Sequence, residues 1–190
     1  AQAQAANFPF CTIEPNVGSV SVPDKRLQLL AELSKSQQTI PARMEFVDIA
    51  GLVQGASQGE GLGNKFLGNI REVDAIVHVV RCFDDDDVIH VSGSVEPKRD
   101  VEVINLELGL ADLSQIEKRR ARLKKQLKIN PEAVLEEEIL QQINSVLEQG
   151  LPARKVLLTD EQERLIKPLG LLTRKPIIYA SNLSEGDLAS

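Results

Sequence analysis

The sequence has few of the residues that build metal centres and disulfide frameworks. It contains two cysteines, Cys11 and Cys82, and two histidines among 190 residues. Two cysteines cannot form the disulfide framework of a small secreted domain, and the missing Cys/His cluster excludes a zinc site. These counts favour a reducing compartment. We therefore expect a cytoplasmic protein, with the plastid stroma as the alternative.

Long apolar runs are missing as well. No segment approaches the roughly 20 apolar residues of a membrane-spanning helix. The first ten residues, AQAQAANFPF, lack the basic and apolar regions of a signal peptide. Hydrophobic residues nevertheless make up 42% of the chain and charged residues 26%, as is typical of a globular domain with a buried core. The sequence predicts one domain, with or without a smaller insertion, and no membrane contact.

Basic residues gather in one stretch of an otherwise acidic chain. The net charge is −6, yet the segment KRRARLKKQLK, from Lys118 to Lys128, holds seven basic residues and no acidic one. Within it, Lys118, Arg119, Arg122 and Lys125 recur at a spacing that predicts one shared helix face. We expect this face to lie in solvent and to contact a polyanion. The alternative is a solvated helix face without a partner.

The first half of the chain alternates strand and helix patterns. Strands are expected over 17–22, 42–49 and 75–82, and helices over 24–35 and 64–72. The loop 50–63, which follows the second of these strands, holds five of the 12 glycines. A strand, a glycine loop, a helix and another strand are typical of a βαβ unit. This order predicts an α/β fold with a parallel sheet.

The second half is mainly helical. Apolar residues at helical spacing predict a long amphipathic helix over 100–128, and Asn130 marks the N-cap of a second helix that ends at Gly150. The short turn between them predicts an antiparallel hairpin whose apolar faces bury each other. A third helix over 159–166 and a strand over 175–180 follow. The helical part is therefore interpreted as an insertion into the α/β domain.

Asp48 and Gly51 lie where α/β folds place their ligands. Asp48 closes a predicted strand and opens the glycine-rich loop, and such folds bind ligands at the carboxyl ends of strands. In a nucleotide-hydrolysing site this aspartate reaches Mg²⁺, and the glycine lets a backbone N–H approach a γ-phosphate because it has no Cβ. The bare string D-x-x-G is also compatible with an aspartate that only caps the next turn.

Two more segments extend this pattern. The segment 7–12, NFPFCT, precedes the first strand and ends in a hydroxyl that can coordinate Mg²⁺, and the segment 182–185, NLSE, follows the last strand, where a base-reading loop would lie. The strings NFPFCTIEPN, DIAGLVQGASQGEGLGNKF, VVRCFDDDD and NLSE occur in this order. Together they resemble the YchF (Obg-like ATPase) family of P-loop NTPases, over essentially the whole chain and including the helical part.

The resemblance implies roles for single residues. Thr12 matches the first-switch threonine that senses Mg²⁺ and the γ-phosphate, Asp48 the acid of the second switch, and Gly51 its phosphate-sensing glycine. Leu52 stands where Ras-like GTPases carry a water-positioning glutamine. Because an apolar side chain cannot orient water, slow hydrolysis is expected. Leu52 is also compatible with a loop leucine that packs on the adjacent helix.

The base-reading residues favour ATP. Guanine-specific relatives use Asn-Lys-x-Asp, whereas here Asn182 is followed by Leu183 and, at the acid position, by Glu185. A displaced carboxylate leaves the N–H donors of guanine badly matched, which weakens discrimination for that base. The family pattern also suggests that Phe83 contacts the adenine ring; otherwise it belongs to the loop core. GTP stays open as the alternative substrate.

One required string is absent. No G-x-x-x-x-G-K-[ST] occurs between Ala1 and Ser190, and this loop holds the α- and β-phosphates in every P-loop NTPase. The resemblance therefore implies an internal part of a longer protein, with the P-loop upstream and a small β-rich (TGS) domain downstream. We expect the chain by itself to be inactive.

On this resemblance the chain forms an incomplete Ras-like P-loop NTPase domain with a mostly parallel sheet and an inserted helical hairpin. Residues 1–111 would hold both switches, 112–170 the helical or coiled-coil insertion, and 171–190 the base-recognition strand and loop. The expected function is a ribosome-associated switch that slowly hydrolyses ATP with Mg²⁺, its basic helix meeting rRNA or another acidic surface. The alternatives are a GTP-specific Obg-type GTPase and a non-catalytic helical-hairpin binding module with a vestigial nucleotide site.

Overall fold

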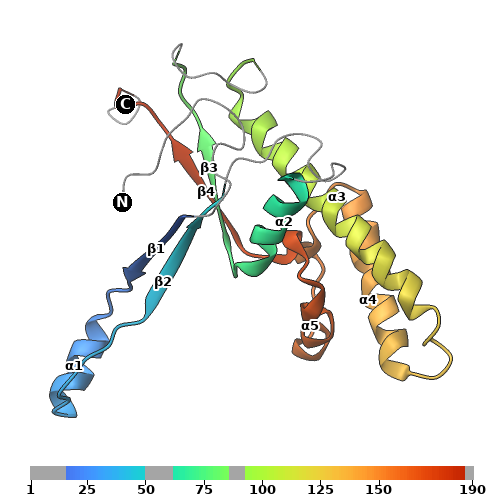
Figure 1. Ribbon diagram of the computed structural model, residues 1–190, viewed down its shortest axis with the longest axis horizontal. Coiled ribbons are helices and arrows are strands. Elements are labelled where there is room, and N and C mark those ends of the chain that lie inside the picture. Colours follow the sequence, from blue (N-terminus) through green and yellow to red (C-terminus); the bar gives the residue numbers. More distant parts are fainter. Residues whose placement is uncertain (1–15, 50–61, 86–92, 187–190) are drawn as a thin grey trace.

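The computed structural model describes residues 16–49, 62–85 and 93–186 of the protein (Figure 1). Strands and helices alternate in the first part of the chain, and a long helical hairpin separates the third strand from the fourth. None of the helices within these ranges is long and apolar enough to cross a membrane. The elements are β1 (Asn16–Ser21), α1 (Lys25–Leu33), β2 (Arg43–Asp48), α2 (Leu62–Glu72), β3 (Ile76–Arg81), α3 (Pro97–Leu123), α4 (Pro131–Glu148), α5 (Asp160–Ile166) and β4 (Ile177–Asn182), with 3₁₀ turns at Ala153–Lys155, Lys167–Leu169 and Leu172–Arg174.

The strands form two separate pairs. β1 and β2 are antiparallel, with Asn16 opposite Asp48, whereas β3 and β4 are parallel, with Ile76 opposite Ile177. The predicted unit of β2, α2 and β3 thus has the expected element order but lacks direct pairing of its two strands. A crossover through a helix can join strands that are not nearest neighbours, so the element order alone did not determine the pairing. Among the described strands, β2 and β3 each pair along one edge only.

The β1–β2 pair and α1 form an arm that extends away from the remaining elements (Figure 1). α1 begins where the Asp24 carboxylate accepts a hydrogen bond from the Arg26 backbone N–H at 2.9 Å, as expected of an N-cap. The helix buries no residue, and three of its four leucines, Leu29, Leu30 and Leu33, are exposed. The helical spacing predicted the helix correctly, although its apolar side has no cover among the described residues.

α3 and α4 form the helical hairpin that the sequence predicts (Figure 1). Asn130 caps α4 by accepting a hydrogen bond from the Glu132 N–H at 2.9 Å. Gly150 follows the helix with φ +75°, a conformation in which a Cβ would be strained. Thr159 caps α5 in a capping box with Gln162. The predicted cap and stop residues of these helices are confirmed.

The buried stripe of α3 differs from the predicted one because the helix has two different partners. Its first half packs through Leu108 and Ala111 on residues of α2, and its second half packs through Ile116 and Leu123 on α4. Leu106, although at helical spacing from Leu110 and Leu113, is exposed. The buried face therefore shifts along the helix. The proposed domain boundary between residues 111 and 112 falls inside this continuous helix.

Candidate functional site

The carboxyl ends of β3 and β4 bring the expected base-reading residues to one edge. Arg81, the last residue of β3, lies opposite Asn182, the last residue of β4. The Cys82 N–H donates to the Asn182 carbonyl at 2.8 Å, which extends the pairing by one residue. Phe83 and the loop that contains Leu183 and Glu185 therefore leave the sheet side by side, at the edge where α/β folds bind ligands.

Arg81 fixes the segment that carries Phe83. Its guanidinium lies 4.8 Å from the centre of the Phe83 ring, a cation–π geometry. The same side chain donates to the carbonyls of Phe83, at 3.0 Å, and Asp85, at 3.1 Å. One face of the ring is thus already in contact with Arg81. No sequence motif singled out this arginine; its position two residues before an aromatic at a strand end is the signal that would have indicated it.

The residues expected to act on the γ-phosphate are only partly described. Asp48 ends β2 with an exposed side chain. Thr12, Gly51 and Leu52 lie outside the described residues. Within the described ranges no group of three or more His, Cys, Asp or Glu side chains is placed to hold a metal ion. The structure thus gathers Phe83 and the NLSE loop at one edge, and places Asp48 at the end of a strand in the other pair.

A small polar cluster lies along the same strand pair. The rings of His78 in β3 and Tyr179 in β4 have centres 5.6 Å apart, and the Asn105 amide of α3 donates to the Tyr179 hydroxyl at 3.2 Å. The His78 Nδ1 is buried without a hydrogen-bond partner in the described structure. Burial lowers the pKa of His78, and the carboxylate of Asp100 partly opposes this shift.

Part of the basic stretch forms ion pairs across the hairpin, and the rest is exposed to solvent. Arg119 donates to both oxygens of Glu136, at 2.6 and 2.7 Å, and Arg120 donates to Glu137 at 2.8 Å. The prediction that Arg119 shares an exposed phosphate-binding face is therefore wrong, because one residue of helix rotation turns it from the side of Lys118 toward α4. The basic side chains that remain exposed are Lys118, Arg122, Lys124, Lys125 and Lys128.

A buried carboxylate that the sequence analysis did not single out lies at the base of the hairpin. Asp112 has no exposed surface and accepts hydrogen bonds from the Leu172 N–H at 2.7 Å, the Thr173 N–H at 2.8 Å and the Thr173 hydroxyl at 2.6 Å. Burial raises the pKa of Asp112, and these hydrogen bonds work in the opposite direction. An aspartate within an apolar helical pattern was the available signal.

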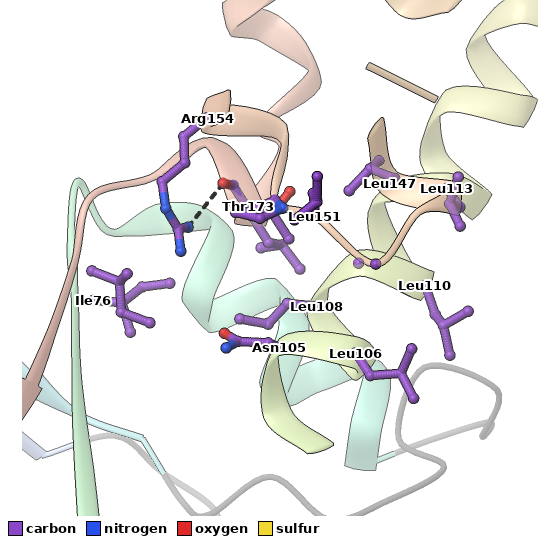
Figure 2. A pocket seen from close by; sticks show the side chains of 15 residues that line it. Ile76, Asn105, Leu106, Leu108, Leu110, Leu113, Leu147, Leu151, Arg154 and Thr173 are labelled. Carbon is purple, nitrogen blue, oxygen red and sulfur yellow. Dashed lines mark hydrogen bonds between the residues drawn. The ribbon is translucent and has the colours of Figure 1, made fainter. Parts of the chain in front are cut away.

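A cavity of about 160 Å³ lies beside this carboxylate, between α3, the end of α4 and the start of β3 and β4 (Figure 2). Its wall is mostly leucine and isoleucine, with Asn105, Arg154 and Thr173 as polar members. Figure 2 shows Arg154 donating to the Thr173 carbonyl, a hydrogen bond of 3.0 Å. The cavity thus lies at the root of the hairpin and apart from the carboxyl edge of the strands.

Comparison with known proteins decides the family. The sequence model of the family described as 50S ribosome-binding GTPase matches residues 1–130. The chain belongs to this family. Its expected resemblance to YchF is also confirmed: it is 56% identical over 190 residues to the ribosome-binding ATPase YchF of Bacillus subtilis, covering 100% of this chain and 52% of the relative. The corresponding protein of Haemophilus influenzae is 53% identical over 183 residues, which are 96% of this chain and 50% of the relative.

A solved structure supports the same assignment. The YchF GTPase of Schizosaccharomyces pombe matches with a TM-score of 0.72 and 42% identity, covering 96% of this chain and 50% of that structure. The chain therefore has the P-loop GTPase domain fold of mixed α and β structure. It spans about half the length of the relatives that it matches.

Proposed function

We propose that this chain is part of a ribosome-associated molecular switch that binds ATP with Mg²⁺ and hydrolyses it slowly. The observation that carries the proposal is the register of β3 and β4, which puts Phe83 and the NLSE loop at one carboxyl edge. Parallel strands present their ligands at that edge. The 56% identity to a protein named a ribosome-binding ATPase supports both the substrate and the partner.

The base would bind between Phe83 and the loop after β4. Arg81 already contacts the Phe83 ring, so the ring is held in place before any ligand arrives. Leu183 is 38% exposed and can pack on a base. Because Glu185 replaces the shorter aspartate of guanine-specific proteins, its carboxylate is displaced from the guanine N–H donors, and adenine is favoured.

The part of the site that binds the phosphates would include residues outside the described ranges. Asp48 has an exposed carboxylate at the end of β2, and oxygen donors of this kind suit Mg²⁺. Asp48 and the Thr12 hydroxyl would hold the ion, which when bound neutralises the charge on the β- and γ-phosphates. The Gly51 N–H would contact the γ-phosphate, and Leu52 cannot orient the attacking water. The remaining phosphate contacts would come from a P-loop. Among the described strands, β2 and β3 each pair along one edge only, so the other edge could accept a further strand.

Nucleotide turnover by the full-length protein tests this assignment. Phosphate release is measured with ATP and with GTP, with and without Mg²⁺, for wild type, Asp48→Ala and Thr12→Ala. We expect slow Mg²⁺-dependent ATP turnover that each substitution lowers by about 10²-fold or more, since each removes an ion ligand. Glu45→Ala, which changes an exposed acid within the same strand, is the matched control. Unchanged turnover in Asp48→Ala, or a preference for GTP, contradicts the proposal.

The ribosome contact is assigned to the exposed part of the basic stretch. Lys118, Arg122 and Lys125 recur at i, i+4 and i+7, which places them near one face. They are exposed, and no ion pair with another described residue is seen for them. Arg119 from the original set is removed because Glu136 neutralises it. The inserted hairpin, proposed to span 112–170, would thereby present cations to RNA phosphates or another acidic surface.

Salt-dependent binding tests the contact. Ribosome affinity is titrated at several salt concentrations for wild type and for the triple variant Lys118→Gln, Arg122→Gln, Lys125→Gln. If each cation meets a phosphate, the variant binds more weakly and its salt slope falls by about one per lost contact. The matched control replaces Lys155, Arg164 and Lys167, exposed cations elsewhere in the helical part, and should keep both values. Equal affinities and slopes for wild type and the first variant would place the contact elsewhere.

A further inference from the structure

The segment Leu172–Lys175 lies against two helices of different origin. Leu172 has no exposed surface, and its side chain belongs to one apolar cluster with Leu67 and Ile70 of α2 and with Leu108 of α3. α2 is the helix that follows the glycine-rich loop containing Gly51 and Leu52. A displacement of α2 therefore meets Leu172 directly, because close-packed side chains transmit movement instead of absorbing it.

Lys175 connects the same segment to the carboxyl end of α2. Its ammonium donates to the carbonyl of Arg71 at 3.1 Å and to the carbonyl of Val73. These carbonyls lie at and just beyond the last turn of the helix, where backbone acceptors lack partners within the helix and a cation is favourable. Lys175 thus fixes the position of α2 relative to the segment that leads into β4.

The other side of the segment holds the base of the hairpin. The Thr173 hydroxyl donates a hydrogen bond to Asp112 of α3 at 2.6 Å and accepts one from the Ala153 N–H at 3.0 Å. Arg174 donates to the carbonyls of Ala153, at 2.8 Å, and Val156, at 3.1 Å, and forms an ion pair with Glu163. These contacts connect α3, the turn after α4, and α5 to one short stretch of backbone.

We propose that Leu172–Lys175 is the junction through which a displacement of α2 changes the orientation of the helical hairpin. Lys175 is the positioning residue on the α2 side, and Asp112 with Thr173 holds the hairpin side. The proposal rests on the proposed function, since it takes nucleotide turnover as the cause of movement and ribosome binding as its result. Leu172 and Lys175 contact α2, whereas Thr173 and Arg174 contact the base of the hairpin. The segment therefore has little freedom to move without carrying one of these two structures with it.

The test compares ribosome affinity in two nucleotide states. Full-length wild type is titrated with a non-hydrolysable ATP analogue bound and with ADP bound, and the ratio of the affinities is the coupling. We expect a ratio of at least about fivefold, the low end of allosteric coupling. Lys175→Met keeps the apolar stem and loses the donors, so its ratio should fall to below about twofold while turnover without ribosomes stays within about twofold of wild type.

Three further variants separate the junction from general stability. Lys175→Arg keeps donors for the two carbonyls and should keep the ratio. Lys155→Met changes an exposed lysine at the hairpin base and should also keep it. Thr173→Val removes the hydroxyl that joins Asp112 to Ala153. It changes the hairpin side of the junction and not the α2 side, and it should also lower the ratio. Thermal unfolding of each variant verifies that it is folded at the assay temperature.

The remaining outcomes contradict either the junction or the proposed function. A full ratio in Lys175→Met overturns the junction, as does a parallel loss of turnover, which would make Lys175 a support of the nucleotide site. Wild type that hydrolyses ATP but binds ribosomes equally in both states overturns the junction and leaves the hydrolysis assignment intact. If wild type shows no turnover, the proposed function is contradicted. The ratio of ribosome affinities with the ATP analogue and with ADP bound still measures the coupling in that case.

Discussion

Arg119 and Glu136 form a two-pronged ion pair across the helical hairpin. Both carboxylate oxygens accept from the guanidinium, at 2.6 and 2.7 Å, and Glu136 is only 3% exposed. Its hydrogen bonds to the Glu136 carboxylate raise the pKa of Arg119. Planar, paired hydrogen bonds of this kind fix the position of one helix along the other. Part of the basic stretch therefore serves the hairpin itself and not an external partner.

Arg119→Gln should destabilise the hairpin. The change leaves the buried Glu136 without its counter-ion, and removing one partner of a buried pair costs about 3–5 kcal/mol. The Arg119 side chain is 35% exposed, so water screens part of the interaction and we expect about 2–3 kcal/mol. Urea unfolding gives the free energy of unfolding. Arg122→Gln, an exposed change in the same helix, should stay within about 0.5 kcal/mol of wild type, and an equally small effect of Arg119→Gln would contradict the role.

Asp112→Ala should cost more than any exposed acidic change in α3. It leaves the N–H groups of Leu172 and Thr173 and the Thr173 hydroxyl without their buried acceptor. A buried unsatisfied donor costs about 1–3 kcal/mol, so we expect a loss of about 3 kcal/mol or more in unfolding free energy. Glu117→Ala, an exposed acid of the same helix, is the control. The melting temperatures of the two variants are compared by thermal unfolding. If they are equal, the hydrogen bonds to Asp112 do not contribute this stability.

His78 should make the protein less stable in weak acid. Its pKa is lowered in the folded state by burial, so well above the unfolded value of about 6.5 the side chain is uncharged in both states and contributes no pH dependence. As the pH falls below the unfolded value of about 6.5, the unfolded chain binds the proton more readily, and stability decreases. The loss continues until the pH passes the lowered folded pKa. The Tyr179 ring lies beside the His78 ring, and the negative charge of Asp100 partly opposes the lowering of the His78 pKa.

A His78→Phe variant isolates this contribution. The free energy of unfolding is measured from pH 7.5 to pH 5 for both proteins, and the difference between them should grow on the acid side by at most about 1.4 kcal/mol per pH unit. Carboxylates affect both proteins equally and cancel in the difference. Parallel curves would mean that His78 titrates alike in the folded and unfolded states.

Local signals predicted the elements of this fold well. Asn130, Gly150 and Thr159 lie at helix ends as expected, because capping depends on residues close in sequence. A parallel sheet was also expected from the order of strands and helices, and β3 and β4 are parallel. What local patterns could not give was strand pairing, since β2 pairs with β1 and β3 with β4. Pairing depends on which edges the whole chain leaves available.

The side-chain partners across the hairpin could not be predicted from the sequence either. Arg119 and Lys118 are adjacent and both basic, yet only Arg119 meets an acid of α4. The distinction depends on how α3 is rotated against α4, which the apolar spacing of one helix does not fix when the buried face shifts along it. Asp112 was missed for a related reason: its donors come from residues 60 and 61 positions further along the chain.

Reinstating the guanine-reading pattern should change the base preference of the full-length protein. The double variant Leu183→Lys, Glu185→Asp restores Asn-Lys-x-Asp after β4, and Asn182 stays in place because its carbonyl accepts from the Cys82 N–H. A shorter carboxylate can then accept both guanine N–H bonds, and sites that pair such donors discriminate strongly. We expect competition between GTP and ATP to shift toward GTP by about tenfold or more. Glu185→Gln, which removes the carboxylate without shortening the side chain, should not produce the shift. If the double variant keeps the wild-type preference, the loop after β4 does not read the base, and Phe83 with its Arg81 contact becomes the element to test.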